Sequence, residues 1–450
     1  MSRRIGLALI VLVLVAGPAA AQPCPDCLGA GAARVAVDLP PGVPLGGYGS
    51  LARRAWVPDL LGRHPHAFWF RPSEGTRDEL AVRALLLQSG STRVAWVAAD
   101  LLAIDASLTA DVGRRLQTAG VAPATLVLSA SHTHSGPGAY VDSTVLGWLA
   151  LDRFDSTVRE ALLGAVASAI RQADAARRPA RLAVASVSGP SIVRSRLRQS
   201  LDQELLVLKV SGARDEPLAL VWSYAIHGTT LGPRNLRLSG DVMGEASARL
   251  ERALGVPALF VNGAVGDVSP NRHGEGATSE LGAQLAALAQ SGWDAATPIP
   301  RPTLAVGVAT AALPAARLSL RNCLRGWAPR ALSLPLGSLF PRETTLTAVV
   351  AGDTGWVTFP GELQTRLGRG IKDAAGLRHV LVAGLSNDYL GYFVAPDDYE
   401  RPSYVSCGVV YGPATGTCLA EGAAVLLRAT ARGEAGTDRR VACDADGAAR

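Results

Sequence analysis

Two histidines separated by one residue stand out in the stretch 125–140, TLVLSASHTHSGPGAY. His132 and His134 follow a short apolar run and precede Gly136 and Gly138. On an extended backbone, residues i and i+2 face the same side, so both imidazoles are expected to point into one cavity at a strand end. The glycines allow another backbone or a ligand to come close. Two histidines at the edge of a loop are equally compatible with ordinary hydrogen-bonded residues, so the pair alone does not define a site.

Two further chemistry-bearing residues are expected at strand ends. His227 ends the apolar run 218–226, and Glu362 follows a predicted hairpin over 346–359. Two histidines and one carboxylate, with a fourth position open for water, form the ligand set of catalytic zinc hydrolases. Because the ligands are far apart in sequence, no contiguous motif supports the site. By spacing alone, a zinc site remains a hypothesis.

The elements that must position these residues are apolar strands alternating with helices. Strands are expected over 81–87, 94–99, 205–210, 218–226 and 258–261, and helices over 108–119, 157–175, 279–290, 363–375 and 420–431. Strands that are apolar throughout are typical of sheets buried on both faces. The pattern predicts an α/β fold: a layered mixed sheet covered by helices, with the central sheet buried on both faces, in one large catalytic domain over 35–432. Ligands of such sheets bind at the carboxyl ends of the strands.

The ends of the chain carry a different kind of signal. Arg3 and Arg4 precede the apolar run 5–15, and Ala19-Ala20-Ala21 supplies a cleavage site. Residues 1–21 are therefore predicted to be a signal peptide, 22–34 a cysteine-containing linker and 433–450 a polar tail. No segment is long enough to span a membrane. We expect a secreted or periplasmic protein.

Composition sets further bounds. The 450 residues carry a formal net charge of +6, and the basic residues are scattered without a run, which argues against nucleic-acid binding. Six cysteines in an exported protein suggest disulfides. We expect Cys407 to pair with Cys418 across a short loop. Cys24 and Cys27 are interpreted as a structural staple in preference to a zinc half-site or a redox pair, and the other pairings stay open.

Several blocks of the sequence, in order, resemble the neutral (non-lysosomal) ceramidase family. These blocks are Ser131–Gly138 (SHTHSGPG), Ile226–Thr229 (IHGT), Ser239–Asp241 (SGD), Val265–Asn271 (VGDVSPN), Phe359–Glu362 (FPGE), Asp398-Tyr399 and Tyr411–Pro413 (YGP). Together they cover almost the whole chain after the predicted signal peptide.

The resemblance implies a zinc-dependent amide hydrolase that cleaves ceramide or a ceramide-like N-acyl lipid. Matched motif by motif, the zinc ligands would be His132, His227, Glu362 and Tyr399. The remaining roles follow from the same matching: His134 as the acid/base residue, Arg194 and Tyr411 as groups opposing the oxyanion, and Ser269 in a supporting hydrogen bond. Zinc would activate a water for attack on the amide carbon.

The sequence departs from the family in two respects. Family members typically carry a C-terminal immunoglobulin-like β-sandwich, which we expect to be absent here, and Val193 stands where the family tends to have Asn. The metal chemistry should therefore carry over better than the substrate, which can also be another N-acyl lipid or small amide. Two alternatives are a serine hydrolase built on Ser269 and a secreted lipid-binding relative without turnover.

Overall fold

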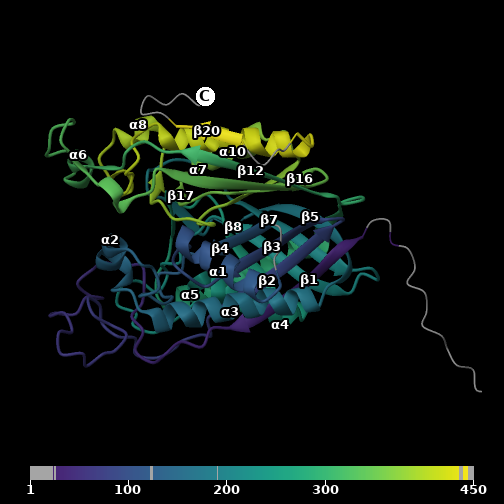
Figure 1. Cartoon of the computed structure of the whole chain (residues 1–450), viewed down its shortest axis with the longest axis horizontal. Coiled ribbons are helices and arrows are strands. Elements are labelled where there is room, and N and C mark those ends of the chain that lie inside the picture. Colours follow the sequence, from purple (N-terminus) through teal and green to yellow (C-terminus); the bar gives the residue numbers. More distant parts are fainter. Residues whose placement is uncertain (1–23, 25–26, 122–124, 190, 435–438, 444–450) are drawn as a thin grey trace, which may run out of the picture.

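The computed structural model describes residues 24, 27–121, 125–189, 191–434 and 439–443, and the predicted signal peptide lies outside these residues. The chain forms four layers in the order helices, sheet, sheet, helices (Figure 1). Mixed α/β architecture is confirmed.

The first sheet has nine strands and carries the histidine motifs. Its order is β4-β3-β2-β1-β5-β7-β8-β9, and β11 pairs with β5. The β3–β4 and β8–β9 pairs are parallel and the other pairs are antiparallel. The strands are β1 (Leu28–Ala36), β2 (Ala81–Ser89), β3 (Thr92–Ala99), β4 (Thr125–Ala130), β5 (Arg178–Ser188), β7 (Glu204–Gly212), β8 (Pro217–Tyr224), β9 (Ala258–Asn262) and β11 (Thr297–Pro298).

The second sheet has five strands, in the order β18-β16-β15-β12-β20. The predicted hairpin is confirmed as the antiparallel pair β15–β16, and β18 and β20 join the sheet in parallel. The strands are β12 (Leu304–Ala312), β15 (Glu343–Ala351), β16 (Thr354–Thr358), β18 (His379–Ala383) and β20 (Arg439–Ala442).

Helices cover only the outer face of each sheet. The first sheet is covered by α1 (Ala106–Thr118), α3 (Ser156–Ala175), α4 (Asp241–Leu254) and α5 (Glu275–Ala295), and the second by α7 (Thr365–Ala374) and α10 (Thr415–Ala431).

The inner faces of the two sheets pack on each other through an apolar cluster. Within it, the rings of Trp96 on β3 and Trp356 on β16 stack with centroids 5.0 Å apart. The first sheet is therefore covered on both faces, as predicted, but helices cover one face and the second sheet covers the other. A continuous apolar strand indicates burial on both faces, but it does not say whether a helix or a second sheet provides the cover.

Short elements fill the loops. They are α2 (Thr144–Leu146), the π-helix η1 (Gly147–Leu151), β6 (Val193–Ser195), β10 (Val268–Pro270), β13 (Arg317–Ser319), α6 (Leu320–Cys323), β14 (Ser333–Pro335), the 3₁₀-helix η2 (Gly337–Leu339), β17 (Glu362–Leu363), β19 (Tyr392–Phe393), α8 (Pro396–Tyr399) and α9 (Tyr404–Cys407).

The disulfides differ from the predicted pairing. Cys24 pairs with Cys27, as interpreted from the sequence. The predicted Cys407–Cys418 pair is wrong, because Cys407 bonds Cys323 and Cys418 bonds Cys443. Folding brings α6 beside α9 and the last strand beside α10, so sequence proximity is a poor guide to either pair.

The predicted ends of the domain also take part in the fold. Strand β1 begins at Leu28, inside the predicted linker, and β20 lies in the predicted polar tail. Within the residues that the structure describes, no helix has both the length and the apolarity needed to cross a bilayer.

Candidate active site

His132 and His134 follow β4 on a backbone that is not extended. His132 has φ 67°, a left-handed conformation that costs a residue with a side chain about 1–3 kcal/mol. The bend is held by Gly228, whose carbonyl accepts from the His134 N–H at 2.8 Å. A Cβ at Gly228 would come within 2.7 Å of the His132 carbonyl oxygen. The two imidazoles converge as predicted, with their Nε2 atoms 3.4 Å apart, but through a strained turn instead of strand alternation.

His227 and Glu362 come to the same point from different layers. His227 follows β8 of the first sheet, and Glu362 begins β17 in the loop that follows the second sheet's hairpin. Glu362 Oε2 lies 3.1 Å from His227 Nε2, and Glu362 Oε1 lies 3.5 Å from His132 Nε2. All three side chains are buried, whereas His134 is half-buried. The structure thus brings together three of the four residues that the resemblance implied as ligands.

The donor set fits a metal ion. His132, His134 and His227 each offer a ring nitrogen, and these atoms lie within 4.8 Å of one another. His227 Nε2 and Glu362 Oε2 are buried and 3.1 Å apart, yet within the described residues neither makes a hydrogen bond. Ligand atoms about 2 Å from a tetrahedral zinc are spaced by about 3.3 Å. A cation between these two atoms would satisfy both.

Neighbouring groups set the protonation that a metal site needs. His132 Nδ1 lies 2.8 Å from the Leu102 carbonyl oxygen, so it carries the proton and leaves the Nε2 lone pair free. Burial, helped by the Arg196 charge, lowers the pKa of His227 to about 3. Burial also lowers the pKa of His134 well below its usual value. At neutral pH the imidazoles of His134 and His227 are therefore neutral and can act as ligands.

Glu362 is the anionic partner of this cluster. Burial alone would raise the pKa of its carboxyl group, but His132 and His227 bring the pKa well below the ordinary value. The carboxylate therefore stays ionised in a buried place, as a ligand of a cation must.

Tyr389 places its hydroxyl on the carboxylate of this cluster, and the ring of Tyr48 lies 4.8 Å from that of His134. The Tyr389 hydroxyl donates to Glu362 Oε1 at 2.8 Å. Tyr399 instead packs at the edge of an apolar cluster that includes Tyr392, and its carbonyl accepts from Asn322 Nδ2. Within the described residues, no hydrogen bond or ion pair links the Tyr399 hydroxyl to the histidines. Tyr399 ends the short helix α8, whereas Tyr389 lies in the loop between β18 and β19.

The arginine beside the cluster is Arg196 and not Arg194. Arg194 is exposed on β6. Arg196 Nε donates to Ser269 Oγ at 2.7 Å, and its Nη1 donates to the Tyr392 hydroxyl at 3.3 Å. The two arginines are two residues apart in an Arg-rich segment, so only the path of the backbone after β6 separates them.

Ser269 and Tyr411 are both engaged elsewhere. The Ser269 hydroxyl supports Arg196, and in the described part of the chain no histidine contacts it by a hydrogen bond. The Tyr411 hydroxyl donates to the Pro341 carbonyl at 2.8 Å, and its buried ring stacks on Phe393. The hydroxyl that lies near Glu362 and Arg196 belongs to Tyr392, and both burial and the Glu362 charge raise its pKa.

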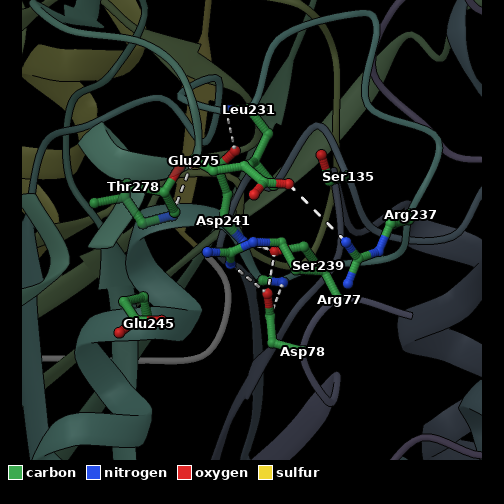
Figure 2. A network of polar contacts seen from close by, with 12 residues as sticks. Arg77, Asp78, Ser135, Leu231, Arg237, Ser239, Asp241, Glu245, Glu275 and Thr278 are labelled. Atoms are coloured by element: carbon green, nitrogen blue, oxygen red, sulfur yellow. Dashed lines mark hydrogen bonds and ion pairs between the residues drawn. The ribbon is translucent and has the colours of Figure 1, made fainter. Parts of the chain in front are cut away.

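Figure 2 shows how the loop after His227 is fixed. Asp241, at the start of α4, accepts hydrogen bonds from the backbone of Thr230 and Leu231. Asp78 accepts from the Gly240 N–H at 2.7 Å and is paired with Arg77. The loop is therefore tied at both ends, which holds His227 in place without direct contact to its ring.

Fold and site together define an α/β protein with a histidine–carboxylate centre suited to a metal ion, placed where strands of two stacked sheets end. The chain belongs to the neutral/alkaline non-lysosomal ceramidase family. The family model described as "Neutral/alkaline non-lysosomal ceramidase, N-terminal" matches residues 69–291. That span contains the three clustered histidines, Arg196 and Ser269, whereas Glu362 and the tyrosines lie beyond it.

The curated relatives share about a quarter of the residues in the segments that align with this chain. The chain is 26% identical over 175 residues to neutral ceramidase B of Dictyostelium discoideum, which covers 34% of this chain and 24% of that protein. It is 27% identical over 165 residues to neutral ceramidase of Pseudomonas aeruginosa, covering 32% and 24%. The matched segments thus span about a quarter of these relatives.

The fold agrees with solved structures over a greater length. The crystal structure of neutral ceramidase from Pseudomonas aeruginosa matches with a TM-score of 0.78 and 19% identity, covering 94% of this chain and 78% of that chain. A structure described as ceramidase complexed with C2 gives a TM-score of 0.79, also at 19% identity. At this identity the likeness establishes the fold.

Proposed function

We propose that the protein is a zinc-dependent amidohydrolase that cleaves the N-acyl amide bond of ceramide or a ceramide-like N-acyl lipid into a fatty acid and a sphingosine-type amine. The observation that carries the proposal is the convergence of His132, His227 and Glu362, with His227 Nε2 and Glu362 Oε2 facing each other without a hydrogen bond. Membership of the family and the names of its relatives supply the substrate class.

The proposed ligands are His132, His227, Glu362 and Tyr389. Tyr389 takes the place first given to Tyr399 because its hydroxyl already contacts Glu362. Zinc held there would lower the pKa of a bound water to about 7 and polarise the substrate carbonyl.

The other residues hold the substrate and move the proton. Arg196 Nη1 donates to the Tyr392 hydroxyl, and both groups can donate a hydrogen bond to the carbonyl oxygen as negative charge develops on it. Ser269 fixes the direction of the Arg196 guanidinium. His134 is neutral and the most exposed imidazole of the three, so it can accept a proton during water attack and deliver it to the leaving nitrogen.

We further propose that the protein is secreted or periplasmic. The predicted signal peptide over 1–21 and three disulfides support an oxidising compartment. A serine hydrolase built on Ser269 is not favoured, because the hydroxyl is held by Arg196 and its sequence context lacks the G-x-S-x-G turn.

A metal-depletion experiment tests the proposal. Fatty-acid release would be measured over a small panel of N-acyl lipids for the native protein, after chelation, and after zinc is restored. The proposal expects loss and recovery of release in step with zinc content, with His379→Ala behaving as the native protein and His132→Ala inactive. Undiminished release after complete zinc removal would disprove it, and release from none of the panel at full zinc occupancy would favour the lipid-binding alternative.

A further inference from the structure

Two loops at one end of the molecule expose large apolar side chains to solvent. Rim loop 1, residues 51–61, exposes Leu51, Trp56, Val57, Leu60 and Leu61, and the Trp56 side chain is fully exposed. Rim loop 2, residues 324–339, exposes Leu324, Leu332, Leu334, Leu339 and Trp327, the last at 91%. Single exposed apolar residues are ordinary, but groups of them mark interaction surfaces.

Rim loop 1 is attached directly to the active site. Arg53 is buried, and its Nη2 donates to the His134 carbonyl at 3.0 Å. The neighbouring Arg54 bonds the carbonyl of Trp148, whose ring is itself exposed beside α2. The loop therefore begins at the half-buried histidine and runs outward from it.

The stem of rim loop 1 is also firmly held. Asp152 accepts hydrogen bonds from the backbone N–H groups of Phe68, Trp69 and Phe70 at 2.7–3.1 Å. A fixed stem keeps the tip from folding back to bury its own apolar side chains.

Rim loop 2 is linked to the site residues through α6 and α9. It follows α6, which the Cys323–Cys407 disulfide joins to α9. On α9, the exposed Tyr404 lies edge-to-face on Tyr392, with ring centroids 6.1 Å apart. In Figure 1, α6, α2 and the purple loop that contains rim loop 1 all lie at the left end of the molecule. Both loops are thus linked to site residues and lie at the same end of the molecule.

Basic residues also gather in and beside the two rim loops. Residues 51–71 hold four arginines and one aspartate, and residues 324–342 hold three arginines and no acid. These two segments together carry a formal charge of +6, although Arg53 is buried and Arg71 is paired with Glu74. Asp59 and Glu400 are the acidic partners of Arg63 and Arg330, whereas Arg325 makes no ion pair within the described residues.

We propose that these two loops dock the protein on an anionic lipid bilayer, with their Trp and Leu side chains in the interface and the exposed Arg63, Arg325 and Arg330 at the headgroups. Exposed aromatic and aliphatic tips flanked by basic residues are the pattern by which proteins bind membrane surfaces without spanning them. The inference rests on the proposed lipid hydrolysis for its purpose, since docking would set the site's mouth against the layer that holds the substrate. Docking itself requires no turnover.

Vesicle binding tests this directly. The intact protein would be mixed with vesicles of phosphatidylcholine alone or of equal parts phosphatidylcholine and phosphatidylglycerol, neither containing an N-acyl amide, and bound protein measured by flotation. We expect binding to the anionic vesicles, with Trp56→Ser and Trp327→Ser each weakening it about tenfold. The matched control Val425→Ser, 44% exposed on α10, should bind as the native protein does.

A second pair of variants tests the charge. Arg63→Gln should reduce the preference for anionic over neutral vesicles, and Arg114→Gln, equally exposed but on α1, should not. His132→Ala should bind vesicles as the native protein does, which separates failure of docking from failure of the proposed hydrolysis.

Three results would overturn the docking proposal. One is absence of native binding to the anionic vesicles; another is unchanged binding of both Trp variants. The third is concentration-dependent self-association that Trp56→Ser and Trp327→Ser abolish, which would assign the surface to a second copy of this chain.

Discussion

The two sheets contribute unlike halves of the active site. The first sheet supplies the imidazoles of His132, His134 and His227, which are held by a strained turn and a tied loop. The loops of the second sheet supply Glu362 and Tyr389, a buried carboxylate and the hydroxyl that it holds. Neither half could hold a divalent cation and balance its charge alone. The comparison suggests that nitrogen ligands come from one layer and oxygen ligands from the other.

The largest effect is expected from removing one ligand from each half. His227→Ala and Glu362→Gln should each abolish zinc binding and lower fatty-acid release on the order of a thousandfold, because the metal contributes several kcal/mol to the barrier. Zinc content and release would be measured together. If only one of the two variants lost zinc, the two halves would not share one ion.

The next comparison is between Arg196, which contacts Ser269 beside the site, and Arg194, which is exposed. Arg196→Ala should lower kcat about a hundredfold with zinc retained, since it removes a donor placed near the site, whereas Arg194→Ala should have little effect. Steady-state kinetics with metal analysis checks this. The reverse order of effects would return the role to Arg194.

A smaller effect is expected from the tyrosine of the second half. Tyr389→Phe should weaken zinc affinity about tenfold, because the variant loses the hydroxyl that contacts Glu362. Tyr399→Phe serves as the matched control, since its hydroxyl has no contact with the cluster in the described residues. Competition with a zinc chelator gives both affinities, and equal values would contradict the assignment.

The pH dependence of stability tests the imidazole half without metal. Folding lowers the pKa of His227 to about 3, whereas in the unfolded protein this pKa is near 6.5. As the pH drops below 6.5, the unfolded protein therefore binds a proton at His227 before the folded protein does. The contribution of His227 to the free energy of unfolding is therefore complete above pH 6.5. It is lost as the pH falls towards 3, by up to about 1.4 kcal/mol per pH unit. Denaturant unfolding of the zinc-free protein at several pH values measures the slope. His227→Gln should reduce the slope, and an unchanged slope would contradict the assignment.

The residues of the first half that the sequence predicts converge in the structure, whereas the tyrosines predicted for the second half do not reach Glu362. His132 and His227 were found because they end strongly apolar strands within distinctive blocks of sequence. Tyr399 and Tyr411 were chosen from a loop with five tyrosines, where only the path of α8 and α9 decides which hydroxyl reaches Glu362. Arg196 was missed for the same reason.

The strands of the first sheet are also easier to predict from the sequence than those of the second. Most strands of the first sheet were predicted, whereas β12 was not, because its small Ala and Gly residues give a weak strand signal. The second sheet as the cover of the first, and the Cys323–Cys407 bond, depend on contacts between remote segments. Local pattern carries no information about such contacts.

Anomalous diffraction at the zinc edge from crystals of the native protein tests the central claim most directly. The account predicts one strong peak about 2 Å from His132 Nε2, His227 Nε2 and a Glu362 carboxylate oxygen. A zinc-loaded, active crystal with its peak elsewhere, or with no peak among these three side chains, would contradict it.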